Sequence, residues 1–197
     1  MVWSSSAHVA VVVMAKAAVP GRVKTRLCSR FSKEQAAAIH LAMLQCTLAR
    51  VGDTFGYNTS HSLHLSIDDS MAAPGEAPPL QVTEPWQLIH QGSGDLGRRL
   101  GFVWRLVGGG PTIFLGSDSP DVPAWALRGI QAALEQSQII VLGPVEDGGF
   151  WTMAGSQYDG RLLEGIDWGT TKVYDQTRRA AQNAGLTIGD APRWYDV

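Results

Sequence analysis

The chain has 197 residues, enough for one domain with a sizeable buried core, and its charge is nearly balanced, with 16 lysines and arginines against 18 aspartates and glutamates. This balance argues against a nucleic-acid partner or an anionic membrane surface, and no apolar run approaches the ~20 residues that a membrane helix needs. The two cysteines, Cys28 and Cys46, fit neither a metal knuckle nor a disulfide framework, so we expect free thiols in a reducing compartment. Together these features predict a soluble cytoplasmic protein.

Strand and helix patterns alternate along the first half of the chain. Val9–Met14 is continuously apolar and β-branched, which predicts a strand covered on both faces at the centre of a parallel sheet. The run ends at Lys16 with no basic segment before it, so no signal peptide is expected. Ser32–Gln35 matches a capping box and predicts a helix that runs to about Val51 and is closed by the following glycine. A second strand is predicted over 63–67, and the proline-rich stretch 71–80 is predicted to be irregular.

The same alternation continues in the second half. The patterns predict strands over 86–90, 112–115, 139–142 and 150–154, an edge strand over 186–188, and helices over 95–107, 123–136 and 172–184. Repeated strand, loop and helix units predict a single-domain α/β fold around a mostly parallel sheet. In such sheets ligands bind beyond the carboxyl ends of the strands, so the loops there carry the candidate functional residues.

A basic loop, AKAAVPGRVKTRL, follows the first predicted strand. Four of its residues are cationic: Lys16, Arg22, Lys24 and Arg26. Because Arg and Lys donors neutralise phosphate charge, and Gly21 permits a tight turn, this loop suits a diphosphate or a triphosphate. A solvated basic turn without a ligand is the alternative.

Acidic residues follow two later strands. In the segment IFLGSDSPD, Asp118 comes just after a buried strand, where a carboxylate can hold Mg²⁺ or Mn²⁺, hard ions that take oxygen ligands and bridge to phosphates. Asp121 lies where the dipole of the next helix favours an acid in any case. In GPVEDGGF, Glu146 and Asp147 would complete a metal site, but a hairpin turn that needs Asp-Gly also explains Asp147.

The segment QGSGDLGRRL (Gln91–Leu100) contains a G-x-G-x-x-G pattern, formed by Gly92, Gly94 and Gly97. A short strand before it, a helix after it and Asp118 further along fit a dinucleotide-binding unit. Against this, Asp95 places a carboxylate at the helix start, where the pyrophosphate would have to sit. The cations, moreover, follow the stronger strand at Val9–Met14. We therefore expect phosphates at the basic loop instead.

Five segments occur in an order that resembles the DUF2064 family of bacterial proteins: AKAAVPGRVKTRL, QGSGDLGRRL, GSDSPD, GPVEDGGF and the terminal YDV. This family is described as glycosyltransferase-like and belongs to the nucleotide-diphospho-sugar transferase (GT-A) superfamily. The resemblance implies one GT-A domain over residues 1–197, with three α/β/α layers around a mostly parallel sheet. The same order is similar to that of sugar-phosphate nucleotidyltransferases and 2-phospholactate guanylyltransferase.

Roles for individual residues follow from this resemblance. It implies phosphate contacts for Arg22, Lys24 and Arg26, an approach to the nucleobase for Gln91 and Gly94, and a metal ligand in Asp118. Asp95 either caps its helix or reaches the ribose.

The expected activity is therefore a metal-dependent transfer that uses Mg²⁺ or Mn²⁺. The chain would bind a nucleotide-sugar or a nucleoside triphosphate and pass its glycosyl or nucleotidyl group to a small-molecule acceptor, with Asp118 and Lys24 closest to the chemistry. The resemblance to DUF2064 favours glycosyl transfer, and the basic loop and short chain favour nucleotidyl transfer. A non-catalytic nucleotide sensor, which needs only the basic loop, is the alternative of a different class.

Overall fold

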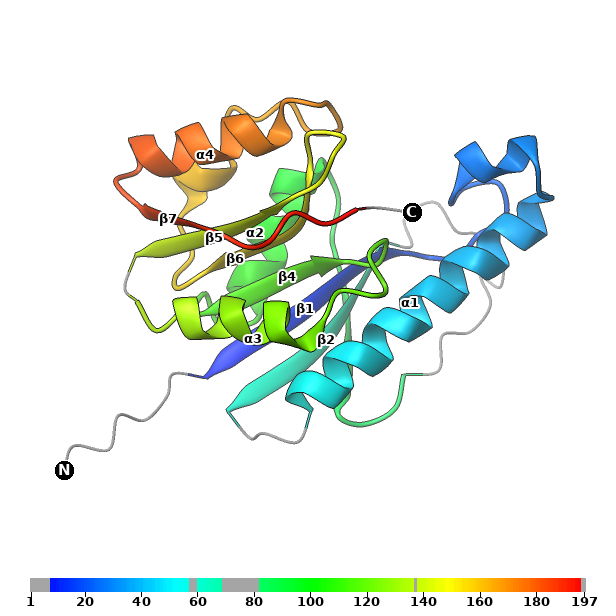
Figure 1. Cartoon of the computed structure of the whole chain (residues 1–197), viewed down its shortest axis with the longest axis horizontal. Coiled ribbons are helices and arrows are strands. Elements are labelled where there is room, and N and C mark those ends of the chain that lie inside the picture. The colour runs from blue at the N-terminus through cyan, green and yellow to red at the C-terminus, as the bar shows by residue number, and fades with distance from the viewer. Residues whose placement is uncertain (1–7, 57–59, 69–81, 137, 196–197) are drawn as a thin grey trace.

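One seven-stranded sheet forms the centre of the molecule (Figure 1), in a computed structural model that describes residues 8–56, 60–68, 82–136 and 138–195. The strands are β1 (Val9–Lys16), β2 (His61–Asp68), β3 (Trp86–His90), β4 (Thr112–Gly116), β5 (Ile139–Pro144), β6 (Phe150–Gly155) and β7 (Thr187–Asp190). Their order is β3-β2-β1-β4-β6-β5-β7, and only β6 among them runs antiparallel to its neighbours. The predicted mostly parallel sheet is confirmed, with β1 inside it as expected. The proline-rich stretch 71–80 lies outside the described residues.

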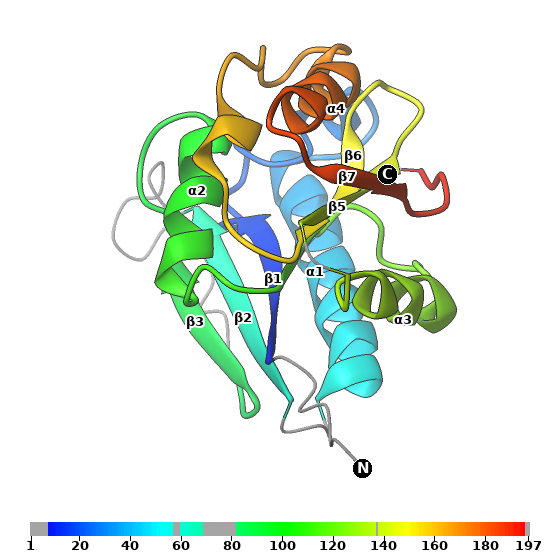
Figure 2. The same ribbon diagram turned by 90° about the vertical axis from the view of Figure 1, so that its left-hand side faces the viewer.

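Helices cover both faces of the sheet, as Figure 2 shows from the side. Helices α1 (Lys33–Phe55) and α3 (Ala124–Ala133) pack on one face, and α2 (Leu96–Leu106) and α4 (Val173–Asn183) pack on the other. Two 3₁₀ helices, η1 (Thr25–Ser29) and η2 (Gly160–Leu163), lie in the connections. Strand β1 needs apolar residues at every position because Val11 and Val13 face one core and Val12 faces the other.

Helix α1 begins as its local sequence predicts but ends later. The Ser32 hydroxyl accepts a hydrogen bond from the Gln35 backbone N–H at 3.2 Å, and the Gln35 side chain accepts one from the Ser32 N–H at 2.8 Å, so the capping box is present. The expected stop at Gly52 is wrong, since the helix continues to Phe55. Val51 and Phe55 lie four residues apart and are both buried, and this packing outweighs the cost of about 1 kcal/mol for a helical glycine.

Parallel strands bring the candidate loops to one edge of the sheet. The loops after β1, β3 and β4 all leave from carboxyl ends, and the β5–β6 hairpin turns at the same edge because β5 is parallel to β1 and β4. In Figure 1 this edge lies to the right, beside the start of α1. The fold therefore collects the basic and the acidic loops at one side of the molecule.

Candidate functional site

The basic loop after β1 is anchored by buried apolar residues and exposes most of its cations. Val19 and Val23 are 2 % and 3 % exposed, and between them the Arg22 N–H donates to the Val19 carbonyl at 3.0 Å. Gly21 has φ +77°, so Val19-Pro20-Gly21-Arg22 has the features of a type II turn. Three cationic side chains of the loop face solvent, those of Lys16, Arg22 and Arg26.

Lys24 differs from these three because its side chain is only 11 % exposed and reaches the acidic loop. Its Nζ lies 3.3 Å from Oδ2 of Asp118, whose side chain is 42 % exposed. Its backbone is left-handed, with φ 46° and ψ 39°, a conformation uncommon for residues other than glycine. The Ser117 hydroxyl donates to the other Asp118 oxygen at 3.3 Å. The structure therefore brings the predicted phosphate ligand Lys24 and the predicted metal ligand Asp118 into contact.

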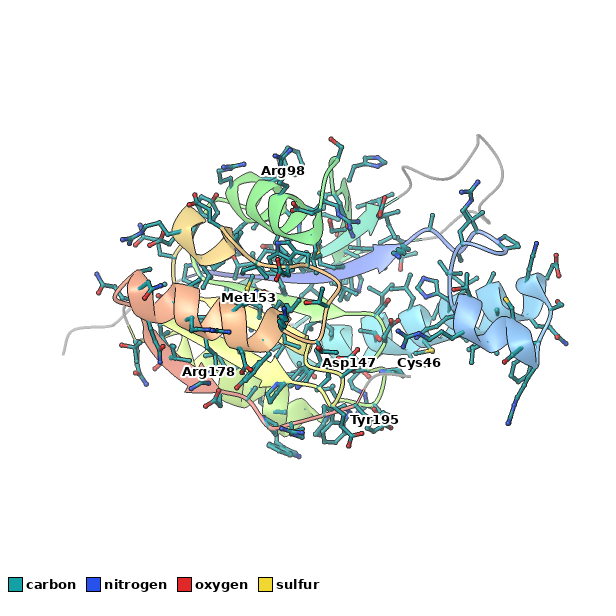
Figure 3. All side chains as sticks on the ribbon, turned by 90° about the horizontal axis from the view of Figure 1, so that it is seen from above. Cys46, Arg98, Asp147, Met153, Arg178 and Tyr195 are labelled. Atoms are coloured by element: carbon teal, nitrogen blue, oxygen red, sulfur yellow. The ribbon has the colours of Figure 1, made fainter. Side chains whose placement is uncertain are left out.

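The two other predicted metal ligands lie in the β5–β6 hairpin. Glu146 and Asp147 are exposed, and Asp147 Oδ1 accepts a hydrogen bond from the Gly149 N–H at 3.0 Å. Gly148 has φ +86°, so the hairpin turn considered as the alternative is present. Because β6 lies between β4 and β5, Asp118 and these acids leave strands about 10 Å apart. In Figure 3 Asp147 lies to the right of Met153 of β6, toward Cys46 of α1.

A carboxylate at this edge could ligate a hard divalent cation only together with ligands from outside the protein. Within 8–56, 60–68, 82–136 and 138–195, no three histidine, cysteine, aspartate or glutamate side chains are grouped so that they could hold a metal ion. Mg²⁺ typically takes one or two protein carboxylates and completes its shell with phosphate and water. Asp118 suits that use because its carboxylate is partly exposed, and a cation bound there would have to compete with the Lys24 ammonium.

Gln91 has a different setting from the one that the resemblance implies. Its side chain is buried, and Nε2 donates to the carbonyls of Ala15 and Ser66 at 3.0 and 2.9 Å. Its Oε1 accepts from Arg99 Nη1 at 3.2 Å. The amide thus ties together the ends of three strands, and contact with a base would require these bonds to break.

An ion pair that the sequence analysis missed stands beside Gln91. Arg99, in the first turn of α2, pairs with Asp68, the last residue of β2, at side-chain exposures of 18 % and 14 %. Asp68 lies opposite Lys16 in the register of β1 and β2. The available signal was an aspartate at the end of a strand in which apolar and polar residues alternate, a weaker form of the signal that pointed to Asp118.

The glycine pattern serves the backbone and the packing of α2. Gly94 is exposed with φ +108°, and Asp95 caps the helix by accepting from the Arg98 N–H at 2.8 Å. A Cβ at Gly97 would lie 2.5 Å from Nε1 of Trp168, so this glycine permits close packing. Of the two roles considered for Asp95, the cap is the one present, and its carboxylate occupies the helix start that a dinucleotide would need.

A second missed feature is the C-terminal segment, which contacts the acidic loop. Trp194 Nε1 donates to Asp121 Oδ1 at 2.9 Å, and the Tyr195 hydroxyl donates to the other oxygen of Asp121. Desolvation acts to raise the pKa of Asp121, but the hydrogen bonds from Tyr195 and Trp194 oppose it and the net pKa is lowered. Asp121 is therefore not a helix cap, and α3 begins after Pro123 without a side-chain cap.

This fold is that of the nucleotide-diphospho-sugar transferases. A protein of Desulfovibrio desulfuricans G20, provisionally described as a nucleotide-diphospho-sugar transferase, superposes with a TM-score of 0.80 at 23 % identity, over 97 % of this chain and 82 % of that one. A cytidylyltransferase from Leptospira borgpetersenii gives 0.55 at 13 % identity, over 96 % and 78 %. Rv0371c of Mycobacterium tuberculosis in complex with manganese gives 0.55 at 17 % identity, over 98 % and 92 %. At these identities the likeness establishes the fold alone.

The chain itself belongs to the DUF2064 family, described as "uncharacterized protein conserved in bacteria", whose model matches residues 52–170. The predicted family is thus confirmed. No curated protein matches the chain. Among the described residues, no helix combines the length and the apolar character needed to cross a membrane.

Proposed function

We propose that this protein is a metal-dependent transferase that binds a nucleotide-sugar or a nucleoside triphosphate at the carboxyl edge of its sheet. The observation that carries the proposal is the contact of 3.3 Å between Lys24 and Asp118. It joins a cationic loop suited to phosphates and a carboxylate suited to a divalent cation, and a nucleotide–metal complex needs both side by side.

In this proposal the basic loop binds the phosphates. Arg22 and Arg26 are exposed and available to a polyphosphate, Lys16 stands at the start of the loop, and Lys24 exchanges Asp118 for a phosphate oxygen. The Gly21 turn holds Arg22 at its position in the loop. These donors neutralise the charge that develops on the phosphate leaving group.

The acidic loops would hold the cation. Asp118 is the central ligand, assisted by Glu146 or Asp147 from the hairpin, and Mg²⁺ or Mn²⁺ bound there supplies further charge stabilisation at the leaving phosphate. Gly94, on the exposed loop after β3, would approach the nucleobase, and Asp95 would cap α2 beside it. The acceptor, a small molecule, takes either the glycosyl or the nucleotidyl group, and no covalent intermediate with the protein is required.

Thermal stabilisation by nucleotides tests this proposal. With Mn²⁺ present, a nucleoside triphosphate or nucleotide-sugar should raise the melting temperature of the wild type. Asp118→Ala should abolish the Mn²⁺-dependent part, whereas Asp53→Ala, which removes an exposed aspartate in the last turns of α1, should retain it. Incubation with a panel of these ligands, followed by mass spectrometry, would then identify the group transferred.

Two outcomes would favour other functions. Stabilisation that needs no metal and survives Asp118→Ala would indicate a nucleotide sensor that binds through the basic loop alone. Stronger stabilisation by NAD than by any mononucleotide would restore the dinucleotide interpretation of the glycine pattern.

A further inference from the structure

The C-terminal segment, residues 191–195, crosses the edge of the sheet at which the candidate site lies. Its backbone continues from β7 along β5, where the Ala191 N–H donates to the Leu142 carbonyl at 2.9 Å and the Trp194 N–H donates to the Pro144 carbonyl at 3.1 Å. From β6, Trp151 Nε1 donates to the Pro192 carbonyl at 2.9 Å. Figure 1 shows the chain running on from β7, in the direction of that strand, toward this edge.

The segment then binds the loop that carries Asp118. Trp194 and Tyr195 donate to the two separate oxygens of Asp121, and the Ser119 hydroxyl donates to the Tyr195 carbonyl at 2.8 Å. The Trp194 and Tyr195 rings stack with centroids 5.9 Å apart and planes 18° apart, which limits the rotation of both donors. The C-terminal segment thus holds the loop on both sides of Pro120.

Helix α1 also holds this loop. Arg50 Nε donates to the Pro120 carbonyl at 3.1 Å. Residues 119, 120 and 121 therefore each bond to an element outside the loop, and they directly follow Asp118. Both Asp121 oxygens already accept a hydrogen bond, so this side chain is used to hold the loop against the C-terminal segment. The Asp118 carboxylate faces Lys24 instead.

We infer that Asp121, together with Trp194 and Tyr195, is a set of positioning residues that fixes the Asp118 carboxylate for cation and phosphate binding. This inference rests on the proposed function for its ligand, a divalent cation bound with a polyphosphate. The C-terminal segment is then a functional part of the site, although it is more than 70 residues away in the sequence.

Removal of one hydroxyl group tests the inference. Tyr195→Phe deletes the donor to Asp121 and keeps the stacked ring. Tyr174→Phe is the control, because the Tyr174 hydroxyl donates to Asp190 at 2.8 Å and accepts from Arg178 at 3.1 Å, so that it removes a tyrosine–aspartate bond that does not involve the Asp118 loop. The readouts are amide hydrogen exchange of residues 116–122 and the affinity for Mn²⁺ with tripolyphosphate, a probe that does not depend on the nucleobase.

Tyr195→Phe should raise the exchange rates in 116–122 and weaken Mn²⁺–tripolyphosphate binding, each by about five-fold, as expected for the loss of one hydrogen bond at an exposed site. Tyr174→Phe should leave both values unchanged. Unaltered exchange in Tyr195→Phe and in Asp121→Ala would overturn the inference, and so would faster exchange with unaltered affinity. A wild type that binds no Mn²⁺–tripolyphosphate would instead refute the proposed function, while the exchange data would still decide whether the C-terminal segment orders the loop.

Discussion

Replacement of Lys24 by methionine should change two affinities in opposite directions. In the free protein the Lys24 ammonium lies where it neutralises Asp118, 3.3 Å from Oδ2. A divalent cation bound by Asp118, as proposed, would compete with this ammonium, and a released Lys24 would become available to phosphate. Lys24→Met keeps an unbranched stem of similar length and removes only the charge.

The size of each effect follows from the geometry of this pair. Two unit charges 3.3 Å apart attract by about 5 kcal/mol at an effective dielectric constant of 20 and by about 1.3 kcal/mol in water. Because the Asp118 side chain is 42 % exposed, the net value lies near that of a surface pair, about 1 kcal/mol. Affinity for Mn²⁺ alone should thus rise about five-fold in Lys24→Met. Affinity for Mn²⁺ with tripolyphosphate should fall by about 5- to 150-fold, because a charged hydrogen bond to phosphate contributes about 1 to 3 kcal/mol.

Electron paramagnetic resonance of free and bound Mn²⁺ measures both affinities in one titration series. Lys172→Met is the control, since it removes an exposed lysine charge from the residue that precedes α4. The control should leave the affinity for Mn²⁺ alone unchanged. A decrease or no change of that affinity in Lys24→Met would refute the idea that Lys24 competes with the metal for Asp118.

Three further predictions concern stability. Gly97→Ala should destabilise the fold by about 1 to 3 kcal/mol in chemical denaturation, because its Cβ would meet Trp168 at 2.5 Å. Gly129→Ala, also helical but in open space, should stabilise the fold by up to about 1 kcal/mol, and equal effects of the two substitutions would contradict the packing argument. Gly148→Ala should lower the free energy of unfolding by about 2 to 4 kcal/mol, because φ is +86° and the added Cβ would lie 2.0 Å from the Thr171 carbonyl oxygen. Gly165→Ala, at φ +67° with no neighbour within 4 Å, should lower it by only about 1 kcal/mol, and the reverse order would contradict the clash. Since the pKa of Asp121 is lowered in the folded state, its ionised form contributes stability that is fully present above the ordinary aspartate value of 3.8 and is lost as the pH falls through the folded value. The stability advantage of the wild type over Asp121→Asn should therefore be constant above about pH 5 and shrink on acidification, and a pH-independent difference from pH 3 to 7 would exclude this linkage.

Elements with local causes could be predicted from the sequence. The β-branched run at Val9–Met14 needs burial on both faces, and the Ser32–Gln35 capping box satisfies helix N–H groups within four residues, so neither depends on distant partners. The parallel-strand rule also placed the basic loop and Asp118 at one edge, where the structure has Lys24 and Asp118 in contact. Ligand binding by these residues stays a prediction.

Features with distant partners could not be predicted in this way. Asp121 has the sequence position of an acid at a helix start, but its hydrogen-bond donors lie 73 and 74 residues further along the chain. Gln91 carries the polar amide expected of a base contact, yet two backbone carbonyls of neighbouring strands engage it. In both cases the residue type correctly predicts that the side chain forms hydrogen bonds. The groups with which it forms them are determined by the fold.

Because β6 runs in the reverse direction, the acidic side of the candidate site is a short hairpin, whereas its basic side is a longer connection. The hairpin with Glu146 and Asp147 is a turn of five residues between two paired strands, so both acids stay close to the end of the sheet. Lys24 and its neighbours lie on a longer connection between β1 and α1, anchored by a few apolar contacts and a short 3₁₀ helix. A ligand bound at this edge, as proposed, would thus meet a short turn on one side and a longer connection on the other, and the connection that carries Lys24 is the side with more room to adjust.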